Sequence, residues 1–332
     1  MKYRKFANTN IELSSIGLGC MGMSAAYGQK DDIQSLATLE KSIELGINFW
    51  DTANIYGNGA NEELISKILT KNRDKVFIAT KFGFRMKDET KDSFSGEVYI
   101  DCSAKHIKEA IEKSLKRLNT DVIDLYYAHR IDPNTPIEET IEAMAKLVKE
   151  GKIKYLGLSE CTADELKKAH AIHPISALQS EYSLLYREVE KEILPLTKEL
   201  GITFVPFAPL GRGLMSNKLD ISSLSKSDFR KNLPRYDGEY LHNNQKLTSE
   251  LEQLAISKNA TSAQLSLAWV LAQSKNIIPI PGTKKIKYLE ENAKAIDLVL
   301  TKDDLEKIEN ILKKYPNVGP RYSDRENKFV KK

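Results

Sequence analysis

Asn48-Phe-Trp-Asp-Thr-Ala-Asn-Ile-Tyr56 reads as the end of a buried strand that runs into a polar turn. The apolar side chains of Phe49 and Trp50 come directly before Asp51, and Tyr56 follows in a turn rich in glycine and asparagine. An ionisable residue at the carboxyl end of an apolar strand is where βα-barrel enzymes place their chemistry. The alternative is that Asp51 only caps the turn and that Tyr56 lies on the surface, because aspartate and asparagine are common turn residues.

On both sides of this stretch, short apolar runs alternate with segments of helical periodicity. The apolar runs predict eight barrel strands, at residues 16–21, 49–50, 76–81, 122–129, 155–159, 177–180, 203–207 and 277–280. The periodic segments predict helices at residues 31–45, 61–69, 103–118, 137–149, 162–171, 189–200, 245–257, 262–273, 286–295 and 301–312. Asn61 and Thr301 are the candidate N-caps of two of these helices.

The near-continuous apolar strands indicate burial on both faces, as in a parallel sheet. Eight βα units predict an α/β fold, a (β/α)8 TIM barrel, with residues 1–332 in a single domain. We expect an N-terminal β-hairpin within residues 2–14 and extra helices before strand eight and at the C-terminus. A doubly wound sheet is the alternative, since Gly17-Leu-Gly-Cys-Met-Gly22 matches Gly-x-Gly-x-x-Gly, but no clear acidic residue closes a strand about 20 residues further on.

The composition is typical of a globular protein in water, with 41% hydrophobic and 29% charged residues. A net charge of +4 is too small and too scattered to predict nucleic-acid binding. Cys20, Cys102 and Cys161 form no close pair and no metal-ligand spacing, which favours a reducing compartment and predicts no metal site. No apolar signal core and no run of eighteen apolar residues occurs in the sequence, so we expect a cytoplasmic protein without a membrane span.

Four ionisable residues close three consecutive predicted strands. Asp51 ends the second strand and Tyr56 follows it, Lys81 ends the third, and His129 ends the fourth. Taken alone, Lys81 could be a structural lysine whose aliphatic chain packs in the protein while its charged end reaches water. Taken alone, His129 could be a core histidine with its hydrogen bonds satisfied. Because strand ends of a barrel form one rim, we interpret the four together as catalytic residues.

This set suits an acid that is aimed at a carbonyl oxygen. A free tyrosine has a pKa near ~10, and a neighbouring ammonium group favours the phenolate and lowers that pKa, at about 1.4 kcal/mol per pH unit. Asp51 is expected to pair with Lys81, and His129 to hydrogen-bond the phenol or the substrate oxygen. The sequence therefore predicts that Tyr56 protonates a carbonyl oxygen as hydride reaches the carbon.

The whole chain resembles the aldo-keto reductase superfamily of NADP(H)-dependent oxidoreductases. The matching motifs are Gly17-Leu-Gly19, Asp51-Thr-Ala-Asn-Ile-Tyr56-Gly-Asn-Gly-Ala-Asn61-Glu62, Ala79-Thr-Lys81, Asp124-Leu-Tyr-Tyr-Ala-His-Arg-Ile-Asp-Pro133, Gly157-Leu-Ser-Glu160, Gln179-Ser-Glu-Tyr-Ser183, Ala208-Pro-Leu-Gly-Arg-Gly213, Ile280-Pro-Gly-Thr-Lys284 and Glu291-Asn292. The Tyr-Tyr-x-His-Arg form is similar to the branch of microbial and plant reductases related to potassium-channel β-subunits.

The resemblance implies a cofactor, NADPH or NADP+, and a role for each matching residue. Tyr56 would be the proton donor, tuned and oriented by Asp51, Lys81 and His129. The implied contacts are Ser159, Glu160 and Gln179 at the nicotinamide carboxamide, Phe207 stacked on the nicotinamide ring, Leu210, Gly211 and Arg212 at the pyrophosphate, Gly282, Thr283, Lys284 and Lys285 at the ribose phosphate, and Glu291 and Asn292 at the adenine. Gly22, Met23, Asp51, Ala208 and Gly213 complete the predicted cofactor contacts.

Three residues depart from the more usual family pattern. Phe207 stands where tyrosine is more frequent, Ala208 where serine is frequent, and Glu160 where many members have asparagine. The preference for NADP has an independent argument, because Lys284 and Lys285 follow the last predicted strand and lysines favour a phosphate over a bare hydroxyl. The alternative for the lysines is a solvated basic start of a helix.

The predicted function is NADPH-dependent, reversible reduction of an aldehyde or ketone to an alcohol. Two other functions stay open: an NADPH-binding redox-sensing subunit with little turnover, and a barrel lyase that forms a Schiff base on Lys81. The substrate is expected to be a small carbonyl compound selected by the loops at residues 83–102, 211–244 and 315–332. Candidate pocket walls are Met23, Tyr27, Tyr56, Phe82, Phe84 and Tyr322, and Arg85 and Arg130 either attract an anionic group or are surface charges. The oligomeric state stays open.

Overall fold

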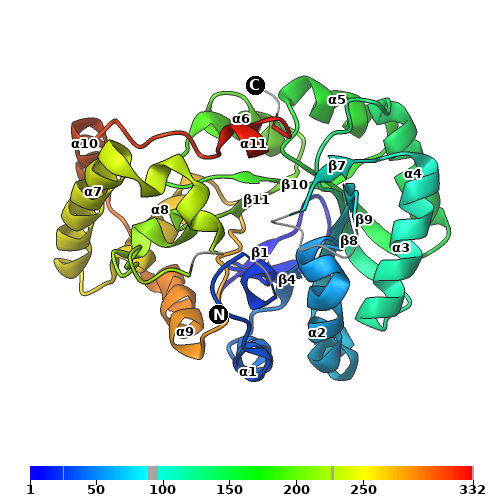
Figure 1. Cartoon of the computed structure of the whole chain (residues 1–332), viewed down its shortest axis with the longest axis horizontal. Coiled ribbons are helices and arrows are strands. Elements are labelled where there is room, and N and C mark those ends of the chain that lie inside the picture. Colours follow the sequence, from blue (N-terminus) through cyan, green and yellow to red (C-terminus); the bar gives the residue numbers. More distant parts are fainter. Residues whose placement is uncertain (25, 89–95, 226–227, 331–332) are drawn as a thin grey trace.

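Parallel strands form the centre of the molecule and helices surround them (Figure 1). The computed structural model describes residues 1–24, 26–88, 96–225 and 228–330. Seven strands lie side by side in sequence order: β3 (Leu18–Gly19), β4 (Phe49–Asp51), β5 (Phe77–Phe82), β8 (Ile123–Ala128), β9 (Ile153–Ser159), β10 (Ile175–Glu181) and β11 (Thr203–Phe207). Their order confirms the predicted barrel over the doubly wound alternative, in which strand order reverses.

The sheet is closed by residues 276–282, which lie between β11 and β3. On the β11 side, the N–H groups of Ile278 and Ile280 donate to strand carbonyls at 2.9 and 3.1 Å. On the β3 side, Pro279 and Pro281 only accept hydrogen bonds, at 2.9 and 3.3 Å. Because proline has no N–H group, these two residues donate no hydrogen bond to β3, and half of the hydrogen bonds of the ladder on that side are missing. The segment predicted at 277–280 therefore occupies the place of strand eight as isolated bridges, not as a regular strand.

Two glycines of the Gly-x-Gly-x-x-Gly match donate these bonds across the seam with β3. A Cβ atom on Gly19 would lie 2.7 Å from the carbonyl oxygen of Ile280, and one on Gly17 would lie 2.7 Å from the ring of Phe49. Contacts this short exclude a side chain at both positions. The glycines thus allow the first and last barrel segments to approach each other.

The predicted N-terminal hairpin is confirmed as β1 (Tyr3–Lys5) paired antiparallel with β2 (Glu12–Ser14). Phe6 follows β1 and packs against the ring of Phe77 at the start of β5, with 4.9 Å between ring centroids. Phe6 and Leu13 are fully buried among side chains of the barrel interior. The hairpin therefore covers the amino ends of the strands and leaves the carboxyl ends for a functional site.

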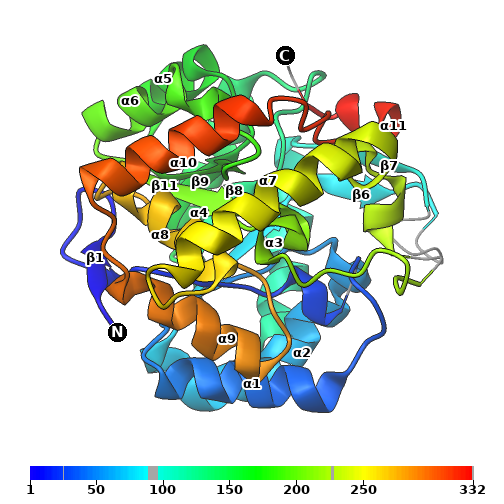
Figure 2. The same ribbon diagram turned by 90° about the vertical axis from the view of Figure 1, so that its left-hand side faces the viewer.

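Helices cover the outside of the barrel, and an apolar layer that includes Trp50 and Trp269 fills the space between helices and strands. The longer helices are α1 (Asp32–Glu44), α2 (Ala60–Leu69), α3 (Ala104–Leu118), α4 (Ile137–Lys149), α5 (Ala163–Ile172), α7 (Gly238–Ile256), α8 (Ser262–Gln273), α9 (Ile286–Ala293) and α10 (Lys302–Lys314), with α6 (Ile193–Glu199) and α11 (Asp324–Asn327) shorter. Helices α7 and α10 cross one side of the barrel together and are the predicted additions (Figure 2). No helix among the described residues is long and apolar enough to cross a membrane.

Two predicted N-caps have different outcomes. Thr301 caps α10 and forms a capping box with Asp304, as predicted. Asn61 is not an N-cap, because α2 begins earlier and its N-cap is Gly59 with φ 95°. Asn61 is instead fully buried, and its side chain bonds the hydroxyl of Thr52 at 2.6 Å and the carbonyl of Cys20 at 2.9 Å. These bonds fix the turn after β4 against the loop after β3.

The loops expected to select the substrate have more regular structure than predicted. The segment 83–102 contains an antiparallel hairpin, β6 (Phe84–Met86) and β7 (Val98–Ile100), which is too short to give a clear sequence pattern. The segment 211–244 contains three short 3-10 turns and the first part of α7, and the tail contains α11. Residues 89–95, 226–227 and 331–332 of these predicted loops lie outside the described residues.

Candidate active site

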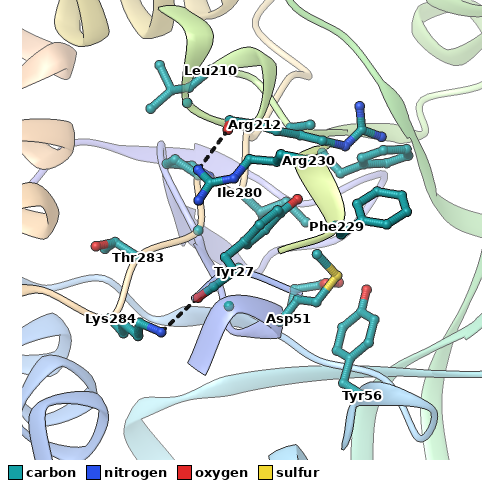
Figure 3. A pocket seen from close by; sticks show the side chains of 18 of the residues that line it. Tyr27, Asp51, Tyr56, Leu210, Arg212, Phe229, Arg230, Ile280, Thr283 and Lys284 are labelled. Atoms are coloured by element: carbon teal, nitrogen blue, oxygen red, sulfur yellow. Dashed lines mark hydrogen bonds between the residues drawn. The ribbon is translucent and has the colours of Figure 1, made fainter. Parts of the chain in front are cut away.

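A cavity of about 890 Å³ opens at the carboxyl ends of the barrel strands. Its wall combines strand ends with the loop after β3, the β6–β7 hairpin, the segment after β11, the start of α9 and the tail. Tyr56 and Asp51 lie on one side of Tyr27 and Lys284 on the other, so the cavity has two arms (Figure 3). Of the predicted catalytic residues, Asp51, Tyr56 and His129 line it, whereas Lys81 is completely buried behind them.

The structure brings the four predicted catalytic residues together. Asp51 ends β4, Lys81 lies in β5, His129 follows β8 and Tyr56 begins the turn after β4. The ammonium group of Lys81 contacts a carboxylate oxygen of Asp51, donates to the carbonyl of Thr52 at 2.7 Å, and lies 3.5 Å from the hydroxyl oxygen of Tyr56. The predicted Asp51–Lys81 pair is therefore present and points a cation at the phenol.

Burial and charge act against each other in this pair. Burial raises the pKa of Asp51 and lowers the pKa of Lys81, while the charge of each partner shifts the other's pKa in the opposite direction. Gln179 donates to the second carboxylate oxygen of Asp51 at 2.8 Å. Asp51 thus accepts hydrogen bonds on both oxygens, which holds it in one orientation behind Lys81.

The acidity of Tyr56 differs from the expectation. Burial, followed by the negative charge of Asp51, raises the pKa of Tyr56 well above its ordinary value, and the charge of Arg130 opposes this rise. The phenol is consequently protonated at neutral pH and holds a proton to donate. The sequence-based argument considered the lysine alone and left out burial, which acts in the other direction.

His129 is neutral at neutral pH. Burial and the positive charges of Lys81 and Arg130 lower its pKa well below its ordinary value. Its ring meets the ring of Tyr56 edge-on, at 5.8 Å between centroids, and Phe84 packs on it at 4.9 Å. The buried Nδ1 atom has no hydrogen-bond partner among the described residues. A neutral imidazole beside the phenol is able to donate one N–H to an oxygen in the cavity.

Most residues predicted to contact a cofactor line this cavity. They are Gly22, Asp51, Ser159, Gln179, Phe207, Ala208, Leu210, Arg212, Gly213, Gly282, Thr283, Lys284, Lys285, Glu291 and Asn292. Met23, Glu160 and Gly211 are not in the cavity wall as the structure describes it. Met23 is buried in the core, and the Glu160 carboxylate turns to Arg321 of the tail, with contacts of 2.5 and 3.1 Å.

The turn after β11 holds an unusual backbone beside the cavity. Ala208 and Arg212 have positive φ values of 48° and 53°, although both carry a Cβ atom, and Gly211 and Gly213 are also in the left-handed region. The hydroxyl of Tyr236 donates to the carbonyls of Gly211 and Arg212 at 2.7 and 3.2 Å and holds the turn in place. Such strain concentrates where a backbone must meet a ligand.

The second arm of the cavity is lined by the start of α9. The ammonium group of Lys284 donates to the carbonyls of Tyr27 and Gln29, at 2.9 and 2.5 Å, and so joins this arm to the loop after β3 (Figure 3). Glu291 pairs with Lys218 at 2.9 Å. Lys285 has an ammonium group 5.9 Å from the ring of Tyr288 and remains exposed at the cavity wall.

The Aldo/keto reductase family model matches residues 15–313 of the sequence. The chain belongs to the aldo/keto reductase family. Its sequence is 42% identical over 306 residues to "Probable aldo-keto reductase 1" of Glycine max, covering 92% of this chain and 87% of that protein. It is 41% identical over 325 residues to the NADP(+) aldo-keto reductase yakc of Schizosaccharomyces pombe, covering 96% and 94% of the two chains.

Solved structures of aldo/keto reductases share the fold over nearly the whole chain. A glycerol dehydrogenase from Gluconobacter oxydans superposes with a TM-score of 0.87 at 27% identity, covering 96% of this chain and 97% of that one. The holo form of an aldo-keto reductase from Bacillus halodurans gives a TM-score of 0.78 at 30% identity, covering 94% and 96%. These comparisons confirm the family resemblance, while the narrower relation to the potassium-channel β-subunit branch stays a prediction.

Several residues that line the cavity of this aldo/keto reductase were not among the predicted site residues. Phe229 and Arg230 come from the irregular segment before α7, Lys218 from the turn after β11, and Phe329 from the tail. Arg230 packs over the ring of Tyr27 at 5.0 Å, so two loops meet across the cavity (Figure 3). The sequence had no periodicity or motif that marks these positions, because loop contacts depend on the path of the chain.

Some of the candidate pocket walls line the cavity and others lie in the core. Tyr27, Tyr56, Phe84 and Tyr322 line the cavity, whereas Met23 and Phe82 are core residues. Arg130 lines it and Arg85 does not, since Arg85 pairs with Asp101 in the hairpin region at 2.9 Å. The described residues contain no group of three or more His, Cys, Asp or Glu placed to hold a metal ion.

Proposed function

We propose that this chain reduces an aldehyde or ketone to the alcohol with NADPH, with Tyr56 as the proton donor. The observation that supports it is the buried Asp51–Lys81 pair, which presents an ammonium group to the Tyr56 hydroxyl at the wall of the cavity. Membership of the aldo/keto reductase family agrees with this chemistry.

The cavity suits a dinucleotide with phosphate groups. Its volume is at the upper end of small-molecule sites, at about 890 Å³. The strained turn at Ala208–Gly213 would meet the pyrophosphate, where backbone N–H groups bind anions well. Lys284 and Lys285 would hold the 2′-phosphate, and Asn292 the adenine. The relative yakc carries NADP(+) in its name, which supports the same cofactor for this chain.

The nicotinamide end would lie on the Tyr56 side of the cavity. Ser159 and Gln179 would hold the carboxamide, and the ring of Phe207 would pack on the nicotinamide. Gln179 keeps its carbonyl oxygen for this task, since its amide nitrogen donates to Asp51. The bound cofactor supplies the hydride that reduces the carbonyl carbon.

The protein supplies the proton. As negative charge grows on the carbonyl oxygen, the Tyr56 hydroxyl donates its proton to that oxygen, and the phenolate that remains is stabilised by the Lys81 ammonium group 3.5 Å away. Asp51 keeps Lys81 charged and in place. His129, neutral and adjacent, donates an N–H to the same carbonyl oxygen and fixes its position. Water then returns a proton to Tyr56, and the alcohol leaves.

Replacing Tyr56 with phenylalanine tests the proposal. Oxidation of NADPH with a panel of aldehydes should proceed in the wild-type protein and fall at least about a thousandfold in Tyr56→Phe, since general acid catalysis contributes 10²–10⁴-fold and the charge stabilisation is lost with it. Tyr3→Phe at the opposite end of the barrel is the matched control and should keep full activity. Unchanged turnover in Tyr56→Phe would refute the mechanism.

The same assay separates the open alternatives. A stoichiometric burst of NADPH oxidation without further turnover would favour the redox-sensing subunit over an enzyme. A Schiff base on Lys81 is disfavoured by the structure, because the ammonium group is fully buried and engaged by Asp51 and Thr52. Borohydride trapping of a carbonyl compound on Lys81 would reverse that conclusion.

A further inference from the structure

Arg130 brings a positive charge to the part of the cavity where the carbonyl group would be reduced. It follows His129 directly and lines the cavity, yet only 8% of its surface is exposed. Its guanidinium group donates to the carbonyl of His129 at 2.7 Å and to the hydroxyl of Ser159 at 3.3 Å, and it packs over Phe84 at 5.6 Å. These contacts fix the orientation of the charge but do not neutralise it.

No carboxylate of the described residues lies within 4.0 Å of the Arg130 guanidinium nitrogens, and its buried Nε atom has no hydrogen-bond partner among them. Burial raises the pKa of Glu160, but the charges of Arg130 and Arg321 outweigh this effect and lower that pKa, so Arg130 shares the negative charge of Glu160 with Arg321. Both hydrogen bonds of the guanidinium group described above use Nη1, so Nη2 is the nitrogen that we assign to a group entering the cavity. Arginine presents its donors in a planar fork that matches a carboxylate.

The neighbouring carboxylates are already engaged by other arginines. Glu160 accepts two hydrogen bonds from Arg321, and Glu181 pairs with Arg212 and Arg235 at 3.0 and 2.9 Å. All of these side chains are almost completely buried. Two carboxylates therefore stand against four guanidinium groups when Arg130 is included, and the cluster has an excess of positive charge.

The acidic residues of the cavity wall form no ion pair with Arg130 in the described part of the chain. Asp51 is paired with Lys81, and Glu291 with Lys218. Glu326 accepts a hydrogen bond from Ser323, and Asp31 caps the start of α1, so both keep their charge, but neither forms an ion pair with the arginine cluster among the described residues. The arm beside Tyr56 thus combines Arg130, one cation of a cluster with excess positive charge, with the apolar walls formed by Phe84, Tyr322 and Phe329.

We propose that the preferred substrates are carbonyl compounds that carry a carboxylate, and that this carboxylate pairs with Arg130 while Tyr56 protonates the carbonyl oxygen. The inference rests on the proposed reductase function and adds a substrate class to it. Arg130 then selects among substrates, while the reaction itself is carried out by Tyr56 and its supporting residues.

Matched acids and esters test this selection. For 5-oxopentanoate against its methyl ester, and 4-formylbenzoate against its methyl ester, kcat/KM with NADPH should favour the acid at least about tenfold in the wild type, since a charge-assisted hydrogen bond to a buried cation contributes one to two powers of ten. In Arg130→Met the acid-to-ester ratio should fall about ten- to a hundredfold. Arg130→Lys should give an intermediate ratio, because the charge remains but the fork is lost.

Arg85→Met is the matched control, since Arg85 lies in the neighbouring hairpin but outside the cavity wall, and it should leave the acid-to-ester ratio unchanged. An equal loss of kcat for acids and esters in Arg130→Met would overturn the inference and make Arg130 a residue that positions or charges Tyr56. An unchanged ratio would overturn it as well.

A measurement on the wild type alone covers the case in which Arg130→Met does not fold. Benzoate should inhibit reduction of the methyl esters at least about tenfold more tightly than benzamide, and equal inhibition would overturn the inference. Turnover of the neutral esters also separates the two proposals. If the aldehyde groups of the methyl esters are reduced as well as those of the acids, the reductase function stands and the proposed substrate class is wrong. If neither kind of substrate is reduced, the reductase function itself is wrong.

Discussion

Lys81→Met removes the charge that faces the Tyr56 hydroxyl and keeps most of the length of the side chain. At the 3.5 Å between Lys81 Nζ and the Tyr56 oxygen, a unit charge pair in an effective dielectric constant of about 20 interacts by about 5 kcal/mol. The charge of Asp51 acts in the opposite sense on Tyr56. We therefore expect a net loss of about 3–4 kcal/mol in transition-state stabilisation, or a factor of about 10²–10³ in kcat.

The substitution also leaves Asp51 buried without its cation. Breaking a buried pair on one side costs about 3–5 kcal/mol of folding free energy, so part of the lost activity could come from unfolding. The double variant Lys81→Met with Asp51→Asn removes both charges. It should regain much of the stability in thermal or urea unfolding but none of the activity, which separates the electrostatic role from the structural one.

The assay is NADPH oxidation under single-turnover conditions with an aldehyde that the wild type reduces. Lys75→Met, an exposed lysine just before β5, is the matched control and should react at the wild-type rate. A folded Lys81→Met protein whose rate stays within about threefold of the wild type would contradict the assignment of Lys81. Recovery of activity in the double variant would contradict it too.

Three more predictions follow from the same structure. Lys285→Met should raise KM for NADPH about tenfold and hardly change KM for NADH, because it removes a cation from the predicted 2′-phosphate site; an equal effect on both cofactors in steady-state kinetics would place Lys285 elsewhere. Burial and neighbouring cations hold the pKa of His129 well below its ordinary value, so His129 should stay neutral and kcat for reduction should not change through its titration between about pH 8 and 6. A change in kcat with a midpoint near pH 6.5 that disappears in His129→Gln would refute this. Asp304→Asn should lower the free energy of unfolding by about 1 kcal/mol near neutral pH, because the capping box of α10 loses its carboxylate. Its partners lower the folded-state pKa of Asp304 to about 2, below the unfolded value, so the difference should fade between pH 4 and 2 in unfolding titrations, and a constant difference would count against the carboxylate.

The sequence predicted the barrel and the cluster of Asp51, Tyr56, Lys81 and His129 because both leave strong local signals. Strands such as 203–207 and helices such as 137–149 were predicted with the bounds that the structure has, since a buried strand and an amphipathic helix differ in period. Asp51, Lys81 and His129 were predicted together because parallel strands bring their carboxyl ends to one rim.

Features that depend on contacts between distant segments were predicted less well. Asn61 has the chemistry of an N-cap, but the chain uses Gly59 and turns Asn61 inward to Thr52 and Cys20. The high pKa of Tyr56 depends on burial by surrounding loops, which no local pattern reports. Glu160 and Arg321 are 161 positions apart in the sequence, and only the folded chain shows that this arginine of the tail pairs with the Glu160 carboxylate.

Pro279 and Pro281 have a consequence for how the barrel opens. Each withholds one N–H from the seam with β3, so the first and last barrel segments lack the backbone hydrogen bonds that these two residues would otherwise donate. The amide protons of Gly17 and Gly19 should therefore exchange with solvent sooner than those of β5 or β8, whose ladders are complete on both sides. Gly19 and Gly282, which both line the cavity, lie at this same seam. Opening of the barrel and access to this part of the cavity would then be one motion, located where the first and last barrel segments meet.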